Sequence, residues 1–67
     1  MEFKKIKGTV SGIIEGKVVV RIKKISSSGL YKWVVMIGSE DTFFEIVDYA
    51  NTLDYAKTLA ESIKGLN

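Results

Sequence analysis

Hydrophobic and polar residues alternate along most of the first fifty positions, which is the pattern of β-strands. The alternation is clearest in the segment 15–24, EGKVVVRIKK. Successive side chains of a strand point to opposite faces of the sheet. The alternation assigns Val18, Val20 and Ile22 to one face and Val19, Arg21 and Lys23 to the other. We interpret the aliphatic set as core and the mixed set as the exposed face.

The same pattern predicts four strands in the chain, over residues 3–14, 17–25, 30–37 and 42–49. Glu15 and Gly16 between the first two strands suit a tight hairpin. Glycines inside the first strand, at Gly8 and Gly12, predict that this strand is curved. The faces of the last strand are ambiguous, although Glu45 favours the set with Phe43 and Val47 pointing outward.

After the last strand the hydrophobic period changes from two to that of a helix, predicted over about 52–64. Its apolar stripe consists of Leu53, Ala56, Leu59, Ala60 and Ile63. Asn51 or Thr52 is expected to cap the first turn. The two alanines would let the helix lie close to a sheet.

The element order predicts a single domain, residues 1–67, of the α+β class: a two-layer fold in which a four-stranded antiparallel sheet is followed by one C-terminal helix (ββββα). One helix covers one face of a sheet. The aromatic face of the third strand is the better candidate for the core. It consists of Tyr31, Trp33, Val35 and Ile37. The opposite face would then combine apolar residues with lysines and an arginine.

The chain has no cysteine and no histidine among its 67 residues. Disulfides and zinc sites of the Cys/His type are therefore excluded, and the most common general base and nucleophile are missing. We predict a protein that is not an enzyme and has no cofactor or metal. No signal peptide is recognisable, and no apolar run approaches the roughly 20 residues that span a bilayer. We expect a soluble cytoplasmic protein without a membrane partner.

A domain this small buries a limited share of its surface, and without disulfides it is expected to gain stability from a second copy. We therefore predict a homodimer. Its contacts are expected on the apolar part of the exposed sheet face, at Val19, Val34 and Met36.

Charge is distributed unevenly along the chain. Residues 1–37 contain eight cations and two carboxylates, and residues 38–67 contain two cations and six carboxylates, so that net charges of +6 and −4 make up the total of +2. Such asymmetry is typical of a protein with a polyanionic partner. Alternatively, the two sets of charges meet on the folded surface.

Under the first interpretation, the basic residues of the exposed sheet face contact the phosphates of a nucleic acid. The residues expected to do so are Lys5, Lys7, Arg21, Lys23 and Lys32.

A family resemblance supports the same interpretation. The segment 14–25, IEGKVVVRIKKI, resembles the first hairpin of the positive-cofactor-four family of transcriptional coactivators, with matching positions Gly16, Lys17, Val18, Val20, Arg21 and Ile22. The resemblance implies four curved strands followed by a helix, a dimer, and binding of single-stranded DNA by the sheet. The segments YKWVVMI and NTLDYAKTLA also look like the end of the arm-type DNA-binding domains of phage integrases.

The competing hypothesis is a protein-interaction module, for example a virus-encoded inhibitor or adaptor. The mixed sheet face would then contact a protein partner. The acidic C-terminal half could alternatively mimic nucleic acid toward a basic target.

Overall fold

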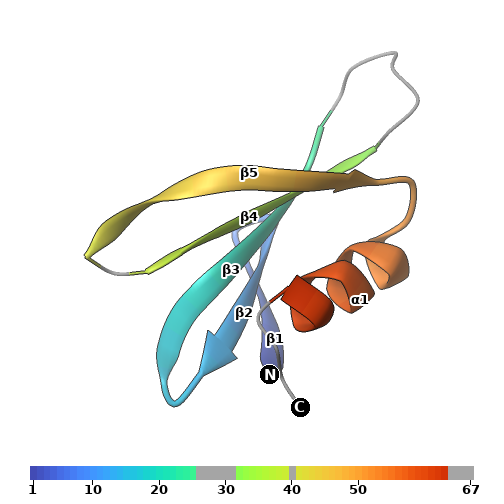
Figure 1. Cartoon of the computed structure of the whole chain (residues 1–67). Helices are drawn as coiled ribbons and strands as arrows, with labels where there is room; N and C mark the ends of the chain where they lie inside the picture. Colours follow the sequence, from blue (N-terminus) through green and yellow to red (C-terminus); the bar gives the residue numbers. More distant parts are fainter. Residues whose placement is uncertain (26–31, 40, 64–67) are drawn as a thin grey trace.

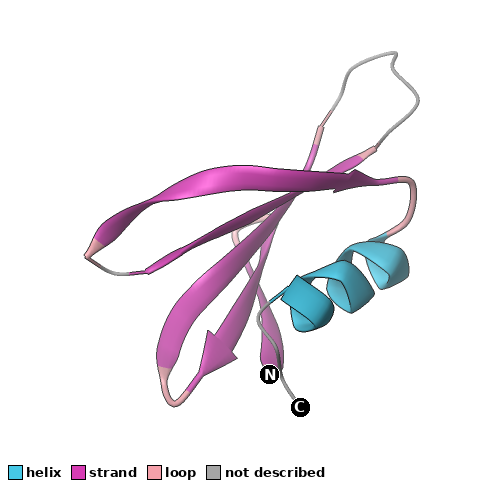
Figure 2. Ribbon diagram, viewed as in Figure 1, coloured by secondary structure: helices cyan, strands magenta, loops and turns pink. Residues whose placement is uncertain are grey.

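The protein folds into one antiparallel sheet with a helix against one face (Figures 1 and 2). The structure, a computed structural model, describes residues 1–25, 32–39 and 41–63. Its elements are β1 (Glu2–Ile6), β2 (Thr9–Ile14), β3 (Lys17–Lys24), β4 (Trp33–Ser39), β5 (Thr42–Ala50) and α1 (Leu53–Ile63). The strands are hydrogen-bonded in the order β1-β2-β3-β4-β5, so that each strand pairs with its neighbours in the chain. The α+β class with a C-terminal helix is confirmed.

The predicted first strand is in fact two strands, and the sheet has five strands instead of four. The chain reverses at Lys7 and Gly8, whose φ angles are 50° and 80°. Two consecutive left-handed residues form the hairpin turn that matches the twist of the flanking strands. The sequence pattern does not predict this turn, because lysine is seldom found in the left-handed conformation.

The predicted hairpin at Glu15 and Gly16 is confirmed, with φ angles of 52° and 78°. β4 runs two residues past its predicted end at position 37, and β5 ends at Ala50. The predicted starting residues of the third strand, 30 and 31, lie outside the described residues, as does position 64 of the predicted helix.

Cross-strand pairing divides the side chains of the sheet between two faces. Val10 pairs with Ile22, which pairs with Val35, and this row lies under α1. Buried core residues from the sheet and the helix are Val10, Val20, Ile22, Val35, Ala50, Ala56 and Ala60. Trp33 and Ile37 pack against this core, as the pattern of the third predicted strand indicates.

The helix is held to the sheet by its small residues. Ala56 and Ala60 are fully buried, so that the helix backbone approaches the strands closely. Thr52 caps the helix as expected, because its hydroxyl accepts a hydrogen bond of 3.2 Å from the backbone N–H of Tyr55. At the edge of the sheet formed by β1, the Lys57 ammonium lies 5.5 Å from the centre of the Phe3 ring.

A bulge in β3 exchanges the expected positions of two valines. Gly12 pairs with Val20 and Ile13 pairs with Val18, so Val19 has no partner in this ladder. Beyond the bulge the side chains change faces. Val19 therefore packs against the core, whereas Val18 lines a hollow on the opposite face together with Arg21. The prediction that Val18 lies inside and Val19 outside is wrong.

Two residues of β5 lie on the faces opposite to the expected ones. Glu45 pairs with Ile37 on the helix side, and Ile46 pairs with Met36 on the other side. Glu45 is nevertheless exposed, because β5 extends well past the end of α1 (Figure 1). An eleven-residue helix is about half as long as a nine-residue strand. Position on the helix side and burial are therefore different properties in this strand.

Candidate nucleic-acid interface

The sheet face away from α1, here called the open face, is defined by its cross-strand rows. Ser11, Arg21 and Met36 form one row across β2, β3 and β4, and Thr9, Lys23 and Val34 form the next. At the edge strands the first row ends in Lys4 and Ile46, and the second ends in Ile6 and Tyr49.

Four of the five cations predicted to contact nucleic acid lie on or beside the open face. Arg21 and Lys23 lie at its centre and are exposed. Lys7 lies in the turn at its edge and lines a hollow of this face. Lys32 lies two residues before Val34, and its backbone N–H donates to the carbonyl of Ala50 at 3.0 Å, which continues the ladder.

The fifth predicted cation, Lys5, belongs to the other face. Lys5 pairs with Val10, whose side chain is in the core. The expectation counted alternation through a continuous strand, whereas the turn at positions 7–8 resets it. Lys4, which pairs with Ser11, takes the corresponding place on the open face.

Arg21 is held in position by an aromatic ring. Its guanidinium carbon lies 4.3 Å from the centre of the Phe44 ring, within cation–π distance. The ring in turn lies against Gly38, where a side-chain Cβ would be 2.8 Å from Cγ of Phe44. Glycine at position 38 thus makes room for the aromatic support under the arginine.

Two adjoining hollows lie on the open face, and Arg21 lines both. The larger has a volume of about 500 Å³ and includes Met36, Phe43 and Phe44 in its lining. The smaller, of about 290 Å³, is lined by Ile6, Lys7, Thr9 and Ser11. Val18, Arg21 and Lys23 contribute to both. The combined surface is polar at the hairpin end of β1 and β2 and aromatic toward β5.

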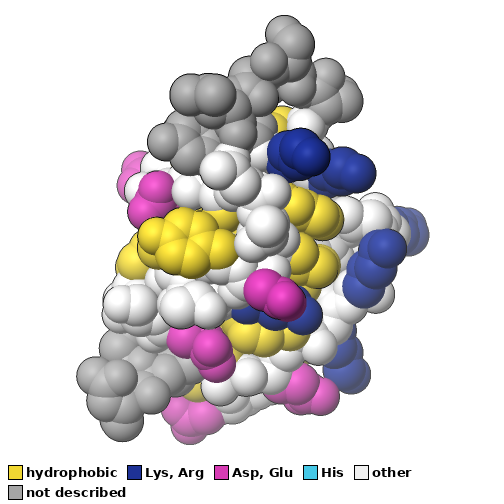
Figure 3. Space-filling view, turned by 90° about the vertical axis from the view of Figure 1, so that its right-hand side faces the viewer, with side chains coloured by type: hydrophobic (Ala, Val, Ile, Leu, Met, Phe, Trp, Pro, Cys, Tyr) yellow, Lys and Arg dark blue, Asp and Glu magenta, His cyan; other side chains and the backbone are white. Residues whose placement is uncertain are grey.

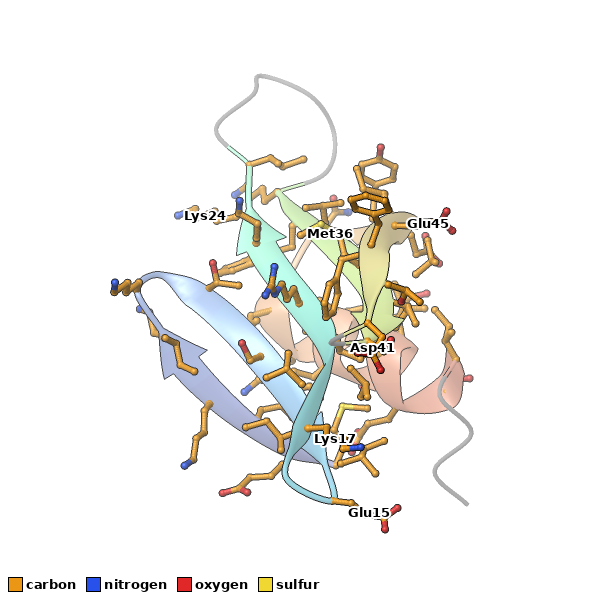
Figure 4. The ribbon with its side chains drawn as sticks, turned by 90° about the vertical axis from the view of Figure 1, so that its left-hand side faces the viewer. Glu15, Lys17, Lys24, Met36, Asp41 and Glu45 are labelled. Carbon is orange, nitrogen blue, oxygen red and sulfur yellow. The ribbon has the colours of Figure 1, made fainter. Side chains whose placement is uncertain are left out.

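Carboxylates lie mostly away from the open face. Glu45 and Asp48 are on the helix side of β5 by their pairing with Ile37 and Val35. Figure 4, with α1 behind the sheet, shows Met36 between β3 and β5, whereas Glu45 points away on the far side of β5. Figure 3 views the side of the molecule that carries α1, and most of the Asp and Glu side chains visible there lie toward the left, whereas most Lys and Arg side chains lie toward the right.

The open face thus has a cationic excess that its own carboxylates do not balance. Glu2, at one corner, has the same orientation as Lys4 and Ile6 in β1. In the part of the chain that the structure describes, none of the open-face cations forms an ion pair. The alternative that the charges of the two halves meet in ion pairs receives no support from these residues.

The three residues predicted to form a dimer contact do not make a common accessible patch. Val19 packs against the core. Val34 lies on the open face but is only 5% exposed, because its neighbours within the chain cover it. Met36 is half-buried and lines the larger hollow.

Exposed apolar side chains gather instead along β5. Phe43 is 92% exposed near the tip of the β4–β5 hairpin, and Ile46 and Val47 are about half exposed. Farther along the strand, the backbone N–H of Tyr49 donates to Oδ1 of Asp48 at 2.7 Å. β5 is an edge strand, and exposed apolar edge strands are sites of association.

Other kinds of site find no support within the described residues. No group of three or more Asp or Glu residues there is arranged to hold a metal ion. No helix in the described ranges is both long and apolar enough to cross a bilayer.

Sequence reasoning missed three residues of this surface: Lys4, Ser11 and Phe44. Recognition of the turn at positions 7–8 would have brought Lys4 and Ser11 onto the same face as Arg21. Phe44 had no such signal, because the side it takes depends on its packing against Gly38. Comparisons with protein-family models, curated proteins and solved structures find no match to the chain.

Proposed function

We propose that the protein binds nucleic acid without catalysis, through the open face of its sheet. The observation that supports this proposal best is the separation of charge. Arg21 and Lys23 lie at the centre of the open face and have no ion-pair partner among the described residues, and the carboxylates of β5 lie on the other side. Cations that are not neutralised within the protein are available to phosphates.

A single strand is the preferred ligand in this proposal. The hollows have the size of a small-molecule site and lie on a concave, mixed polar and aromatic surface. A guanidinium supported by a ring, as Arg21 is by Phe44, presents a flat face on which an unpaired base can stack. Phe43 adds a largely exposed ring at the edge of the larger hollow.

The test is a charge-reversal experiment with a matched control. The R21E/K23E variant is titrated with fluorescent single-stranded and duplex oligonucleotides at low salt. The control, K5E/K57E, changes net charge by the same amount on the helix side. We expect R21E/K23E to lose roughly tenfold or more in affinity and the control to retain most of it. Equal losses in both variants would mean that net charge, and not the open face, governs binding.

A second candidate function, a protein-interaction module, is favoured by the exposed side chains of β5. Edge strands recruit additional strands, and Phe43 is the most exposed large apolar residue of those described. In this alternative a second copy or a partner protein pairs with β5. Sedimentation of wild type and F43S over a range of concentrations separates the two: a dimer that F43S dissociates favours this function, and a monomer in both speaks against self-association.

A further inference from the structure

Ser11 is an unusual residue on the open face. It lies in the middle of β2 and is only 6% exposed, the one polar or charged side chain among the described residues that is buried. Its hydroxyl has no hydrogen-bond partner among them. A hydroxyl with no partner inside the protein is available to a ligand wherever it reaches the surface.

The side chains around Ser11 are mainly cationic and polar. Ser11 pairs with Lys4 on one side and with Arg21 on the other, so that the three side chains lie in one row on the open face. It also lines the smaller hollow with Lys7, Thr9 and Lys23. Among the described residues, every side-chain oxygen or nitrogen that is sealed from solvent has a hydrogen-bond partner. The Ser11 hydroxyl has none, so it is in contact with solvent, and the hollow that Ser11 lines provides that contact.

We propose that this hollow is a binding site for one phosphate group. The Ser11 hydroxyl donates a hydrogen bond to a phosphate oxygen at the floor, and Arg21 and Lys23 donate from the rim. The Phe44 ring acts on the far side of Arg21 as a positioning group, because it limits the directions that the guanidinium can take. The identity of the ligand as a backbone phosphate rests on the proposed function. The inference adds that one phosphate is bound at a defined point instead of along a diffuse cationic surface.

A defined phosphate-binding site loses affinity when an uncharged hydrogen-bond donor is removed, whereas a diffuse cationic surface does not. Hydrogen bonds to charged groups are stronger than neutral ones, so S11A should weaken binding of a single-stranded oligonucleotide by roughly tenfold. Because serine carries no charge, the salt dependence should not change. Removal of an unpartnered hydroxyl should leave the melting temperature unchanged or raise it. The control S62A removes an exposed hydroxyl from α1 and should alter none of these quantities.

Three results would overturn the inference. S11A could bind as tightly as wild type, it could weaken binding no more than S62A does, or it could lower the melting temperature by several degrees, which would assign the hydroxyl a structural role.

A second titration separates this inference from the proposed function. Wild-type protein is titrated with inorganic phosphate at constant ionic strength while its backbone amide NMR signals are followed. We expect shifts confined to Thr9, Ser11, Arg21 and their neighbours, and their loss in S11A. If oligonucleotides do not bind but these shifts appear, the proposed function is wrong and the phosphate-binding site takes a smaller phosphate compound. If neither ligand shifts the amide signal of Ser11, the hollow is not a phosphate-binding site.

Discussion

Substitution of Arg21 and Lys23 by glutamine should change how strongly salt weakens nucleic-acid binding. Each phosphate neutralised on a single strand contributes about 0.7 to the slope of log affinity against log salt. The open face and its edges present five cations for such contacts: Lys4, Lys7, Arg21, Lys23 and Lys32. If all of them contact phosphates, the slope is about −3.5, and it becomes about −2.1 in R21Q/K23Q.

These slopes correspond to measurable differences. Between about 50 and about 200 mM salt, wild-type affinity should fall about 130-fold, and that of R21Q/K23Q only about 18-fold. Fluorescence anisotropy with an unstructured oligonucleotide of uniform sequence measures both. The matched control K5Q/K57Q should keep the wild-type slope, because Lys5 and Lys57 lie on the helix side. A wild-type slope near zero, or the same reduction in the control, would refute the assignment of phosphate contacts to the open face.

Three further predictions concern the parts of the fold that support this face. G38A should lower the free energy of unfolding by about 1–3 kcal/mol, because its Cβ would lie 2.8 Å from the carbonyl oxygen of Phe43; an unchanged urea midpoint would show that the strands separate freely there. T52A should cost about 0.5–2 kcal/mol by removal of the cap on Tyr55 N–H, and circular dichroism melting should detect it; equal melting of T52A and T52S would be expected only if the cap is unimportant. E15N should stabilise the protein by roughly 1 kcal/mol, because asparagine tolerates the φ of 52° better than glutamate does; E15Q is the control, and a gain of the same size in E15Q would point to charge instead of backbone conformation.

The elements with regular periodicity were predictable from sequence. The alternation of β3 correctly placed Val20 and Ile22 in the core and Arg21 and Lys23 on the open face. All four residues lie on the same side of the bulge, where the alternation is regular. The helical spacing of Ala56 and Ala60 likewise identified the face that packs against the sheet. In both cases the signal lies within one element and needs no knowledge of its neighbours.

Other features depend on pairing between strands, which local alternation does not encode. The bulge at Val19 follows from the register of β2 against β3, and a similar irregularity leaves Val47 without a partner in β5. A lysine in the left-handed conformation concealed the turn after Ile6 and so moved Lys5 to the wrong face. The candidate site was therefore predicted at its centre and missed at its edges.

The central claim, that a nucleic acid occupies the open face, is tested most directly by the location of the contacts on the protein. Amide NMR signals of ¹⁵N-labelled wild-type protein are followed during titration with a single-stranded oligonucleotide. We predict that the largest shifts map to Ser11, Arg21, Lys23, Met36 and Phe44, while exposed positions of α1 such as Glu61 and Ser62 remain unchanged. Shifts concentrated on α1 or on the outer edge of β5, or the absence of any shift at low salt, would contradict the account.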